Sequence, residues 1–255
     1  MGVLELFRLD GKVALVTGAG RGLGQAIAIA LAEAGADIAG LYVNRIDETQ
    51  AQVKALGQRF LGIACDLRQT TPDDLSQIVS EVVQVLGGLH ILVNNAGISR
   101  RAPAMEYSER DWDDVTQVNL KTVFFLAQAA ARWMTGHGGG KIINMTSMLS
   151  FQGGVLVPAY TAAKSGMAGL TRALANEWAS RRINVNAIAP GYMTTEMTLD
   201  LQQDPVRNAA ILERIPAGRW GQANDVQGAV VFLASPASDY LHGVILPVDG
   251  GWLAR

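Results

Sequence analysis

Short, nearly continuous apolar runs alternate along the chain with longer stretches whose apolar residues recur at helical spacing. The runs are rich in β-branched residues, as in parallel strands that are buried on both faces. Strands that alternate with helices are typical of a sheet covered by helices on both sides. We therefore predict an α/β doubly wound fold around a seven-stranded parallel sheet. Its strands are expected at residues 12–18, 36–43, 59–65, 90–97, 140–147, 183–190 and 243–251.

Helices are expected between these strands, and several of their first residues are typical helix starts, such as proline or a capping side chain. We expect them to begin near Gly22, Asp47, Pro72, Glu109, Pro158 and Asn224. The stretch 191–221 is polar and irregular, which favours a small lid over a site at the carboxyl ends of the strands. No linker or repeat divides the sequence, so residues 1–255 are predicted to form a single domain.

Composition and charge exclude several classes of function. The net charge is -2, without blocks of like charge, so neither nucleic acid nor an anionic membrane is an expected partner. No apolar run approaches the ~18 residues of a membrane span, and the first residues lack a signal-peptide pattern. Cys65 is the single cysteine, which fits a reducing cytoplasm and excludes an intrachain disulfide or a thiolate metal site. We expect a soluble cytoplasmic protein without a bound metal.

The segment between the first strand and the first helix, "VTGAGRGLG", is rich in glycine. Gly18, Gly22 and Gly24 lack side chains where the turn tightens and where backbone N–H groups would approach a pyrophosphate at the helix N-terminus. A plain strand-to-helix turn also uses glycine, but this position between a strand and a helix is typical of dinucleotide-binding motifs. We therefore predict a phosphate-binding loop in which Arg21 and Leu23 also face the nucleotide.

Two further strand ends carry residues that suit a nucleotide. After the third strand, "CDL" provides Asp66, whose carboxylate could accept a hydrogen bond from an adenine amino group, and the backbone of Leu67. After the fourth strand, "NNAG" provides Asn94, which can tie neighbouring strands together, then Ala96 and Gly97, where the chain can pass close to a ligand. Each could be an ordinary strand end, but their shared place at the carboxyl edge favours a binding site.

A serine, a tyrosine and a lysine come together in "SMLSFQGGVLVPAYTAAK". Tyr160 and Lys164 share one face of the helix that begins near Pro158, and Ser147 ends the strand before it. An ammonium about 4 Å from a phenol would favour the phenolate by about 4 kcal/mol, or roughly three pKa units. Tyr160 could then exchange a proton with a substrate oxygen that Ser147 orients, while hydride moves at carbon. A Tyr and a Lys on an ordinary amphipathic helix are the alternative.

These motifs resemble the short-chain dehydrogenase/reductase family. The resemblance covers nearly the whole chain, through "TGAGRGLG", "CDL", "NNAG", "VNL", Ser147, "YTAAK", "NVNAIAPG" and "VDGGW". It implies a Rossmann fold and an NAD(P)-dependent oxidoreductase that acts on CH–OH groups. It adds Asn119 as a fourth catalytic residue, which supports a water between Lys164 and bulk solvent.

The resemblance also implies further contacts and an assembly. Tyr160 and Lys164 would contact the cofactor as well as the substrate, Lys164 through the nicotinamide ribose. Around the nicotinamide carboxamide and the pyrophosphate it places Pro190, Gly191, Met193 and Thr195. Members of the family are commonly homotetramers through the helices that bear Asn119 and Tyr160. The apolar stripes of those helices could equally face the sheet.

Longer strings, such as "VPAYTAAKSG", "INVNAIAPGYM" and "RIPAGRWG", resemble the family members that act on deoxy sugar acids. They imply reduction of a diketo deoxy sugar acid from uronate breakdown. A guanidinium can bind the carboxylate of such a substrate, and we select Arg101 over Arg100 for this role. A solvated loop arginine is the alternative. Met148, Gln152 and Tyr192 are predicted substrate-wall residues, with packing as their other explanation.

Two other functions stay open. The protein could act on another polyol, a ketogluconate or an alginate-derived keto acid, with the same catalytic residues. It could also be a non-catalytic dinucleotide sensor that binds a partner protein. A sensor would be free to lose Ser147, Tyr160 or Lys164, and all three are present.

The choice between NAD and NADP depends on the end of the second strand. An acidic residue there usually binds the ribose 2′-hydroxyl of NAD, and a nearby arginine accommodates the 2′-phosphate of NADP. This sequence has Tyr42 and Val43 at that place, and Arg21 and Arg45 nearby. The family resemblance favours NAD, which we predict, with NADP as the open alternative.

Overall fold

A single sheet of seven parallel strands, in the order β3-β2-β1-β4-β5-β6-β7, lies at the centre of the molecule. The computed structural model describes residues 2–255. The predicted strands and the doubly wound fold are confirmed, and only turn residues at the predicted ends lie outside the strands. The strands are β1 (Val13–Thr17), β2 (Asp37–Tyr42), β3 (Phe60–Ala64), β4 (Ile91–Asn94), β5 (Gly140–Met145), β6 (Ile183–Pro190) and β7 (Ile245–Val248).

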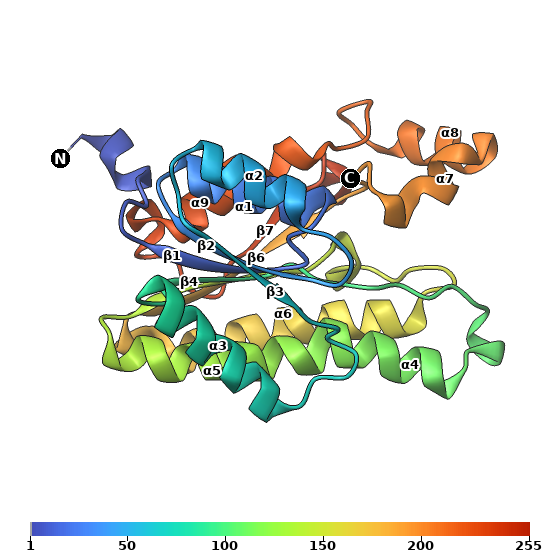
Figure 1. Cartoon of the computed structure of the whole chain (residues 1–255). Helices are drawn as coiled ribbons and strands as arrows, with labels where there is room; N and C mark the ends of the chain where they lie inside the picture. Colours follow the sequence, from blue (N-terminus) through green and yellow to red (C-terminus); the bar gives the residue numbers. More distant parts are fainter. Residues whose placement is uncertain (1) are drawn as a thin grey trace.

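Helices cover both faces of this sheet, which explains why the strands are apolar without interruption (Figure 1). One layer consists of α1 (Gly22–Glu33), α2 (Asp47–Ala55) and α9 (Gln227–Ala234). The other consists of α3 (Pro72–Leu86), α4 (Glu109–Thr116), α5 (Thr122–Gly136) and α6 (Pro158–Trp178). A separate hydrophobic cluster fills the space between the sheet and each layer.

The predicted helix starts are confirmed at five of the six positions. At Pro72 the start is fixed by Thr71, which forms a capping box with Asp74. The exception lies near Asn224, where a short 3-10 turn, η7 (Ala223–Val226), comes first and α9 begins only at Gln227. Asp225 accepts a hydrogen bond from the backbone of Gln222 at 2.7 Å and so caps the start of this turn.

The helical stretch that begins at Glu109 is not uniform. A π-helical turn, η3 (Gln117–Lys121), joins α4 to α5. Such a turn is wider than an α-helical one and is frequent at functional sites. It contains Asn119, whose side chain is fully buried.

The prediction of an irregular segment at 191–221 is wrong in part, because this segment contains two helices. They are α7 (Leu199–Gln203) and α8 (Pro205–Arg214), which stand above one end of the sheet (Figure 1). Asp204 caps α8 by accepting hydrogen bonds from the backbone of Val206 and Arg207, and proline fills the first position. Buried residues of the lid pack against the segments 148–149 and 252–253. This lid cluster comprises Met148, Leu201, Ile211, Ile215, Trp220 and Trp252.

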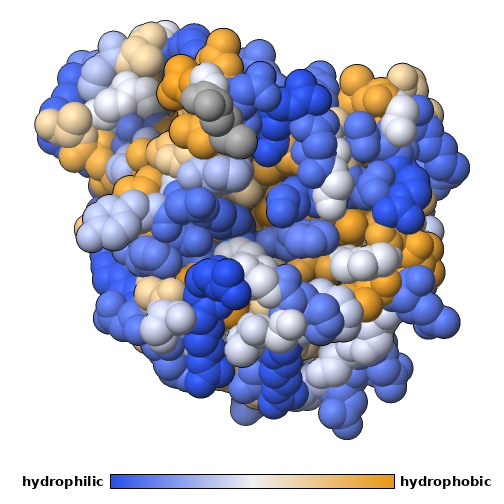
Figure 2. Space-filling model, turned by 90° about the vertical axis from the view of Figure 1, so that its left-hand side faces the viewer, coloured by the Kyte–Doolittle hydropathy of each residue, from blue (hydrophilic) through white to orange (hydrophobic). Residues whose placement is uncertain are grey.

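Figure 2 shows the end of the molecule where the N-terminus lies. Hydrophilic side chains predominate on this face, and hydrophobic ones form smaller groups between them. Among residues 2–255, no helix combines the length and the apolar character needed to cross a bilayer.

Candidate active site

The order of the sheet creates a crevice between β1 and β4. The chain runs from β1 outward to β2 and β3, then returns to place β4 on the other side of β1. Ligands of open α/β sheets bind at such a switch point, outside the carboxyl ends of the strands. Thr17 joins the two loops here, because its hydroxyl accepts hydrogen bonds from the backbone of Asn95 at 3.0 Å and of Ala96 at 2.8 Å.

The glycine-rich loop is built for close approach of backbone to backbone. Gly18 has a φ of +68°, which strongly disfavours larger residues. At Gly24 a Cβ would collide with the carbonyl oxygen of Gly18 and come within 2.5 Å of Asn95 Nδ2. Asn95 itself donates from Nδ2 to the carbonyl of Thr17 at 2.8 Å. The loop, the start of α1 and the end of β4 therefore form one compact cradle that suits a pyrophosphate.

Three residues predicted to bind the cofactor lie around this cradle, already in contact with protein groups. Arg21 precedes α1, and its guanidinium forms an ion pair with Glu196 of the lid. Leu23 packs, partly buried, against the cluster under α1. Asp66 follows β3, and its carboxylate pairs with Arg68 at 2.5 Å, which lowers the pKa of that carboxyl.

The end of β2 approaches the glycine-rich loop. Tyr42 is the last residue of β2, and its ring packs near Gly62 and within the cluster under α1 and α2. The backbone carbonyl of Arg45 lies against Gly20. Neither Tyr42 nor Arg45 has a carboxylate that could bind a ribose hydroxyl, as the sequence already indicated.

Ser147, Tyr160 and Lys164 come together beyond the end of β5. Ser147 precedes the 3-10 turn η4 (Met148–Ser150) and accepts a hydrogen bond from Leu149 N at 3.1 Å. Its hydroxyl also lies close enough to the phenol of Tyr160 to lower the pKa of that phenol. One helical turn after Tyr160, Lys164 is buried, and its Nζ donates to the carbonyl of Met145 at 2.6 Å. The ammonium lies 5.5 Å from the centre of the Tyr160 ring.

Burial dominates the acid–base properties of this pair. It raises the pKa of Tyr160 to about 12, against a smaller lowering by the hydrogen bond with Ser147. It lowers the pKa of Lys164 to about 7. The expectation that Lys164 lowers the pKa of the phenol is therefore wrong for the ligand-free protein. The physical reason is that Nζ is directed to Met145, and that burial, nearly complete for Lys164 and partial for Tyr160, disfavours the charged form of each group.

Asn119 is positioned by the backbone of the loop that follows β4. Its Oδ1 accepts from Ile98 N at 2.9 Å, and its Nδ2 donates to Ile98 O at 2.7 Å. Gly97 lies between Asn119 and the catalytic lysine, because a Cβ there would be 3.1 Å from Asn119 Oδ1 and 3.7 Å from Lys164 Nζ. The absence of a side chain at Gly97 thus leaves room beside the ammonium.

Polar residues hold α6 against the sheet, and of these only Asn94 and Lys164 were predicted from the sequence. Asn94 donates to Asn144 of β5 at 2.9 Å, and Asn144 donates to Thr171 of α6 at 3.0 Å. The hydroxyl of Ser150 donates to the carbonyl of Lys164 at 2.7 Å. The prediction that Asn94 ties neighbouring strands is confirmed. For Asn144 the sequence did contain a signal, because an asparagine is unusual inside an otherwise apolar strand.

Residues predicted near the nicotinamide follow β6. Gly191 donates its N–H to the carbonyl of Val248 at 3.0 Å, and a Cβ at this position would collide with Asp249. Met193 is buried, its backbone bridges to Gly221, and its carbonyl accepts a hydrogen bond from Thr198 Oγ1 at 2.6 Å. The predicted residues Pro190 and Thr195 lie at the end of β6 and at the start of the 3-10 turn η6 (Glu196–Thr198).

The predicted substrate residues divide into two groups. Met148 and Tyr192 belong to the lid cluster, where Tyr192 packs edge-on against Trp252 with ring centres 4.8 Å apart, so packing explains both. Gln152 and Arg101 are more open to a ligand. Gln152 accepts a hydrogen bond from Arg214, and Arg101 is exposed. Arg101 makes no ion pair with another of the residues 2–255.

Within residues 2–255, no three His, Cys, Asp or Glu side chains gather in a group that could hold a metal ion.

Comparison with known proteins agrees with this geometry. A family model described as enoyl-(acyl carrier protein) reductase matches residues 18–253. The chain belongs to the short-chain dehydrogenase/reductase family. It is 56% identical to 2-dehydro-3-deoxy-D-gluconate 5-dehydrogenase of Escherichia coli (strain K12) over 254 residues, which cover 99% of this chain and 100% of that one. Identity to the enzyme of the same name from Bacillus subtilis (strain 168) is 52%, with full coverage of both chains.

A solved structure extends this likeness to three dimensions. A candidate 2-deoxy-D-gluconate 3-dehydrogenase from Agrobacterium tumefaciens, determined with bound NADP, superposes with a TM-score of 0.91 at 53% identity. The match covers 98% of this chain and 99% of that one. The fold that the sequence predicted is thus that of a short-chain dehydrogenase/reductase.

The buried lysine leads to a prediction about stability and pH. Between pH ~7 and ~10 the unfolded chain binds more protons at Lys164 than the folded chain, because the pKa falls from ~10.4 to about 7 on folding. The free energy of unfolding should therefore rise with pH in this window, by about 1.4 kcal/mol per pH unit at most. Above pH ~10 Tyr160 reverses the slope, because its pKa is higher in the folded protein.

Urea unfolding of the wild type and of Lys164→Met at pH 6.5, 8 and 9 measures this difference. The variant should lack most of the rise between pH 7 and 9. Parallel stability profiles of the two proteins would contradict the assignment of a neutral lysine above pH 7.

Proposed function

We propose that this protein is an NAD(P)-dependent 2-dehydro-3-deoxy-D-gluconate 5-dehydrogenase of uronate catabolism. The observation that carries the reaction class is the meeting of Ser147, Tyr160 and Lys164 beside a dinucleotide cradle. The substrate class is supported by the full-length similarity to enzymes of that name. We further propose that it acts in the cytoplasm, which fits its single cysteine.

The cofactor would lie across the crevice, with its pyrophosphate on the cradle of Thr17, Gly18 and Gly24 and its nicotinamide near Gly97. The cofactor fits here because glycines leave space that a side chain would occupy, above all Gly97, which faces Lys164 Nζ. When bound, the nicotinamide supplies or accepts the hydride at the substrate carbon. We also propose the other cofactor contacts that were predicted from the sequence, at the strand ends and in the lid.

Ser147 and Tyr160 would handle the substrate oxygen. The Ser147 hydroxyl is in place to hold the carbonyl oxygen, and the Tyr160 hydroxyl is in place to give it a proton as the carbon is reduced. In the opposite direction the phenolate of Tyr160 takes the proton from the alcohol. A pKa of about 12 in the ligand-free protein makes that step unfavourable, so the cofactor-bound site must stabilise the phenolate.

Lys164 would pass protons between Tyr160 and solvent in this scheme. Its ammonium is buried, so a proton that passes from it to Tyr160 after reduction must be replaced from solvent. The room at Gly97, next to the side chain of Asn119, suits a water on that path. Asn119 thus positions the entry of the proton, with its own side chain fixed by the backbone of Ile98.

The function is tested by steady-state reduction of the diketo deoxy acid derived from unsaturated galacturonate. We expect turnover by the wild type and a loss of about 10²–10⁴-fold in kcat for Tyr160→Phe. Tyr240→Phe, at a fully exposed tyrosine, is the matched control and should keep wild-type activity. Nucleotide binding by Tyr160→Phe, followed by fluorescence, should persist. Bound nucleotide without turnover of any keto acid or polyol by the wild type would instead support the sensor function.

The preference between the two cofactors depends, in our proposal, on the lid. We retain NAD as the preferred cofactor because Glu196 takes up the charge of Arg21, which a 2′-phosphate would need. The relative with bound NADP keeps the alternative open for testing. Both side chains are about 60% exposed, so the pair contributes only about 1 kcal/mol or less.

Glu196→Gln should release Arg21 and lower KM for NADPH by up to about fivefold, with little change for NADH. Asp200→Asn, at another acidic residue of the lid, is the control. The two KM values are measured at a fixed concentration of the same keto acid. An equal response of both nucleotides to Glu196→Gln would disprove the role of this ion pair in selection.

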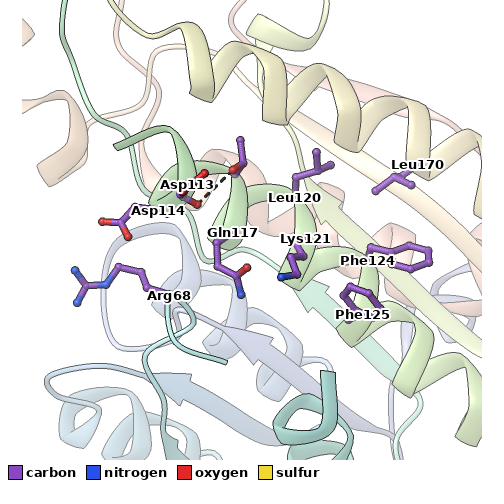
Figure 3. A pocket seen from close by; sticks show the side chains of 10 residues that line it. Arg68, Asp113, Asp114, Gln117, Leu120, Lys121, Phe124, Phe125 and Leu170 are labelled. Carbon is purple, nitrogen blue, oxygen red and sulfur yellow. Dashed lines mark hydrogen bonds between the residues drawn. The ribbon is translucent and has the colours of Figure 1, made fainter. Parts of the chain in front are cut away.

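We propose self-association to a homotetramer through α5 and α6. Support comes from a hollow of about 530 Å³ on this face, shown in Figure 3. Arg68 and Asp114 lie at one end of the hollow, and Phe124, Phe125 and Leu170 lie at the other. Apolar side chains beside charged ones suit a self-complementary contact.

Phe124→Arg should shift the mass measured by light scattering from a tetramer to a smaller species, because a charge would be buried in the contact. Val85→Arg places the same charge on an exposed apolar residue of α3 and should leave the mass unchanged. A tetramer in both variants would show that another face forms the contact.

A further inference from the structure

The proposed substrate is an acid, and this inference rests on that proposal. Its carboxylate lies toward the other end of the carbon chain from the carbon that is reduced, so a cation must stand at some distance from Ser147 and Tyr160. Several arginines near the site are already paired with carboxylates. Arg21 pairs with Glu196, and Arg219 pairs with Asp225 at 2.7 Å.

Arg100, next to the predicted anchor, is also occupied. Its guanidinium lies 3.4 Å from Asp111 and 3.9 Å from Asp114, both of α4. Arg101 has no such partner, yet no hydrogen bond within residues 2–255 orients its side chain either. An unoriented, exposed arginine loses side-chain entropy when it binds a ligand, which weakens its contribution.

Arg214, the last residue of α8, is different. Its guanidinium carbon lies 4.0 Å from the centre of the Trp252 ring, and its Nη2 donates to Gln152 Oε1 at 3.2 Å. None of the ion pairs among residues 2–255 includes Arg214. Arg214 is exposed, as Arg101 is, but the Trp252 ring and Gln152 orient its guanidinium while most of its five N–H donors stay available.

The groups that hold Arg214 are themselves anchored to the site. Gln152 lies in the loop that follows Ser147, five residues further along the chain. Trp252 is buried in the lid cluster, together with Met148, the residue directly after Ser147. The lid, the C-terminal segment and the loop after the catalytic serine thus meet at Arg214.

From this geometry we infer that Arg214 binds the carboxylate of the acidic substrate and thereby selects acids over neutral sugars. Trp252 supports the guanidinium from one side, and Gln152 fixes its rotation. The planar, pre-oriented fork matches the two oxygens of a carboxylate. Arg101, selected from the sequence alone, becomes the comparison residue rather than the anchor.

The test compares Arg214→Met with Arg101→Met, using the sugar acid and its uncharged carboxamide as two substrates. For Arg214→Met we expect KM for the acid to rise about ten- to hundredfold, because a charge-assisted hydrogen-bonded pair is lost. Its kcat and its KM for the carboxamide should change little. Arg101→Met should leave all four values near those of the wild type. Arg214→Lys keeps the charge but not the fork and should lie between.

The outcomes separate this inference from the proposed function. Turnover of the acid by the wild type supports the function; its absence overturns both. With an active wild type, a raised KM in Arg101→Met alone would assign the carboxylate to Arg101. An equal loss on acid and carboxamide in Arg214→Met, with a lower Tm, would show that Arg214 merely holds the lid. Either result overturns the inference and leaves the function intact.

Discussion

A single hydrogen bond, from the buried ammonium of Lys164 to the carbonyl of Met145, governs the layout of the site. A charged amine without water is costly, and this short contact of 2.6 Å offsets part of that cost. It also fixes the distance between α6 and the end of β5, and with it the place of Tyr160 relative to Ser147. The rest of the cost of burying the charge lowers the pKa of the amine to about 7. A lysine that can lose its proton near neutral pH is suited to a proton path.

The polar contacts behind Lys164 keep this arrangement in place. Asn94, Asn144 and Thr171 form a chain of hydrogen bonds from β4 through β5 to α6, inside a core that is otherwise apolar. Apolar packing alone tolerates small shifts of a helix over a sheet, whereas satisfied buried amides specify one position. Together with the bond from Ser150 to the carbonyl of Lys164, they define the register of the catalytic helix.

The sequence predicts the strands well because parallel strands that are covered on both faces need continuous apolar runs, and those are visible without tertiary information. It also predicts the meeting of Tyr160 and Lys164, since residues four apart on a helix share a face. It does not predict the bond from Lys164 to Met145, the π-helical turn at Asn119 or the pairing of Asp66 with Arg68. The first two depend on which element packs opposite, and the last depends on the local turn after β3. The helices of the lid had a local signal, Asp204 followed by Pro205, which its polar composition obscured.

The lid connects both halves of the proposed specificity. At one end Glu196 reaches Arg21 at the phosphate loop, and at the other Arg214 reaches Gln152 in the loop after Ser147. The ion pair between Glu196 and Arg21 is exposed and weak, so it can exchange a protein partner for a ligand group at low cost. Between the two contacts the lid cluster supplies a rigid apolar base. Ligands at the two ends would therefore act on one connected segment. Any effect of one ligand on the affinity of the other would be mutual, because linkage between two sites is reciprocal.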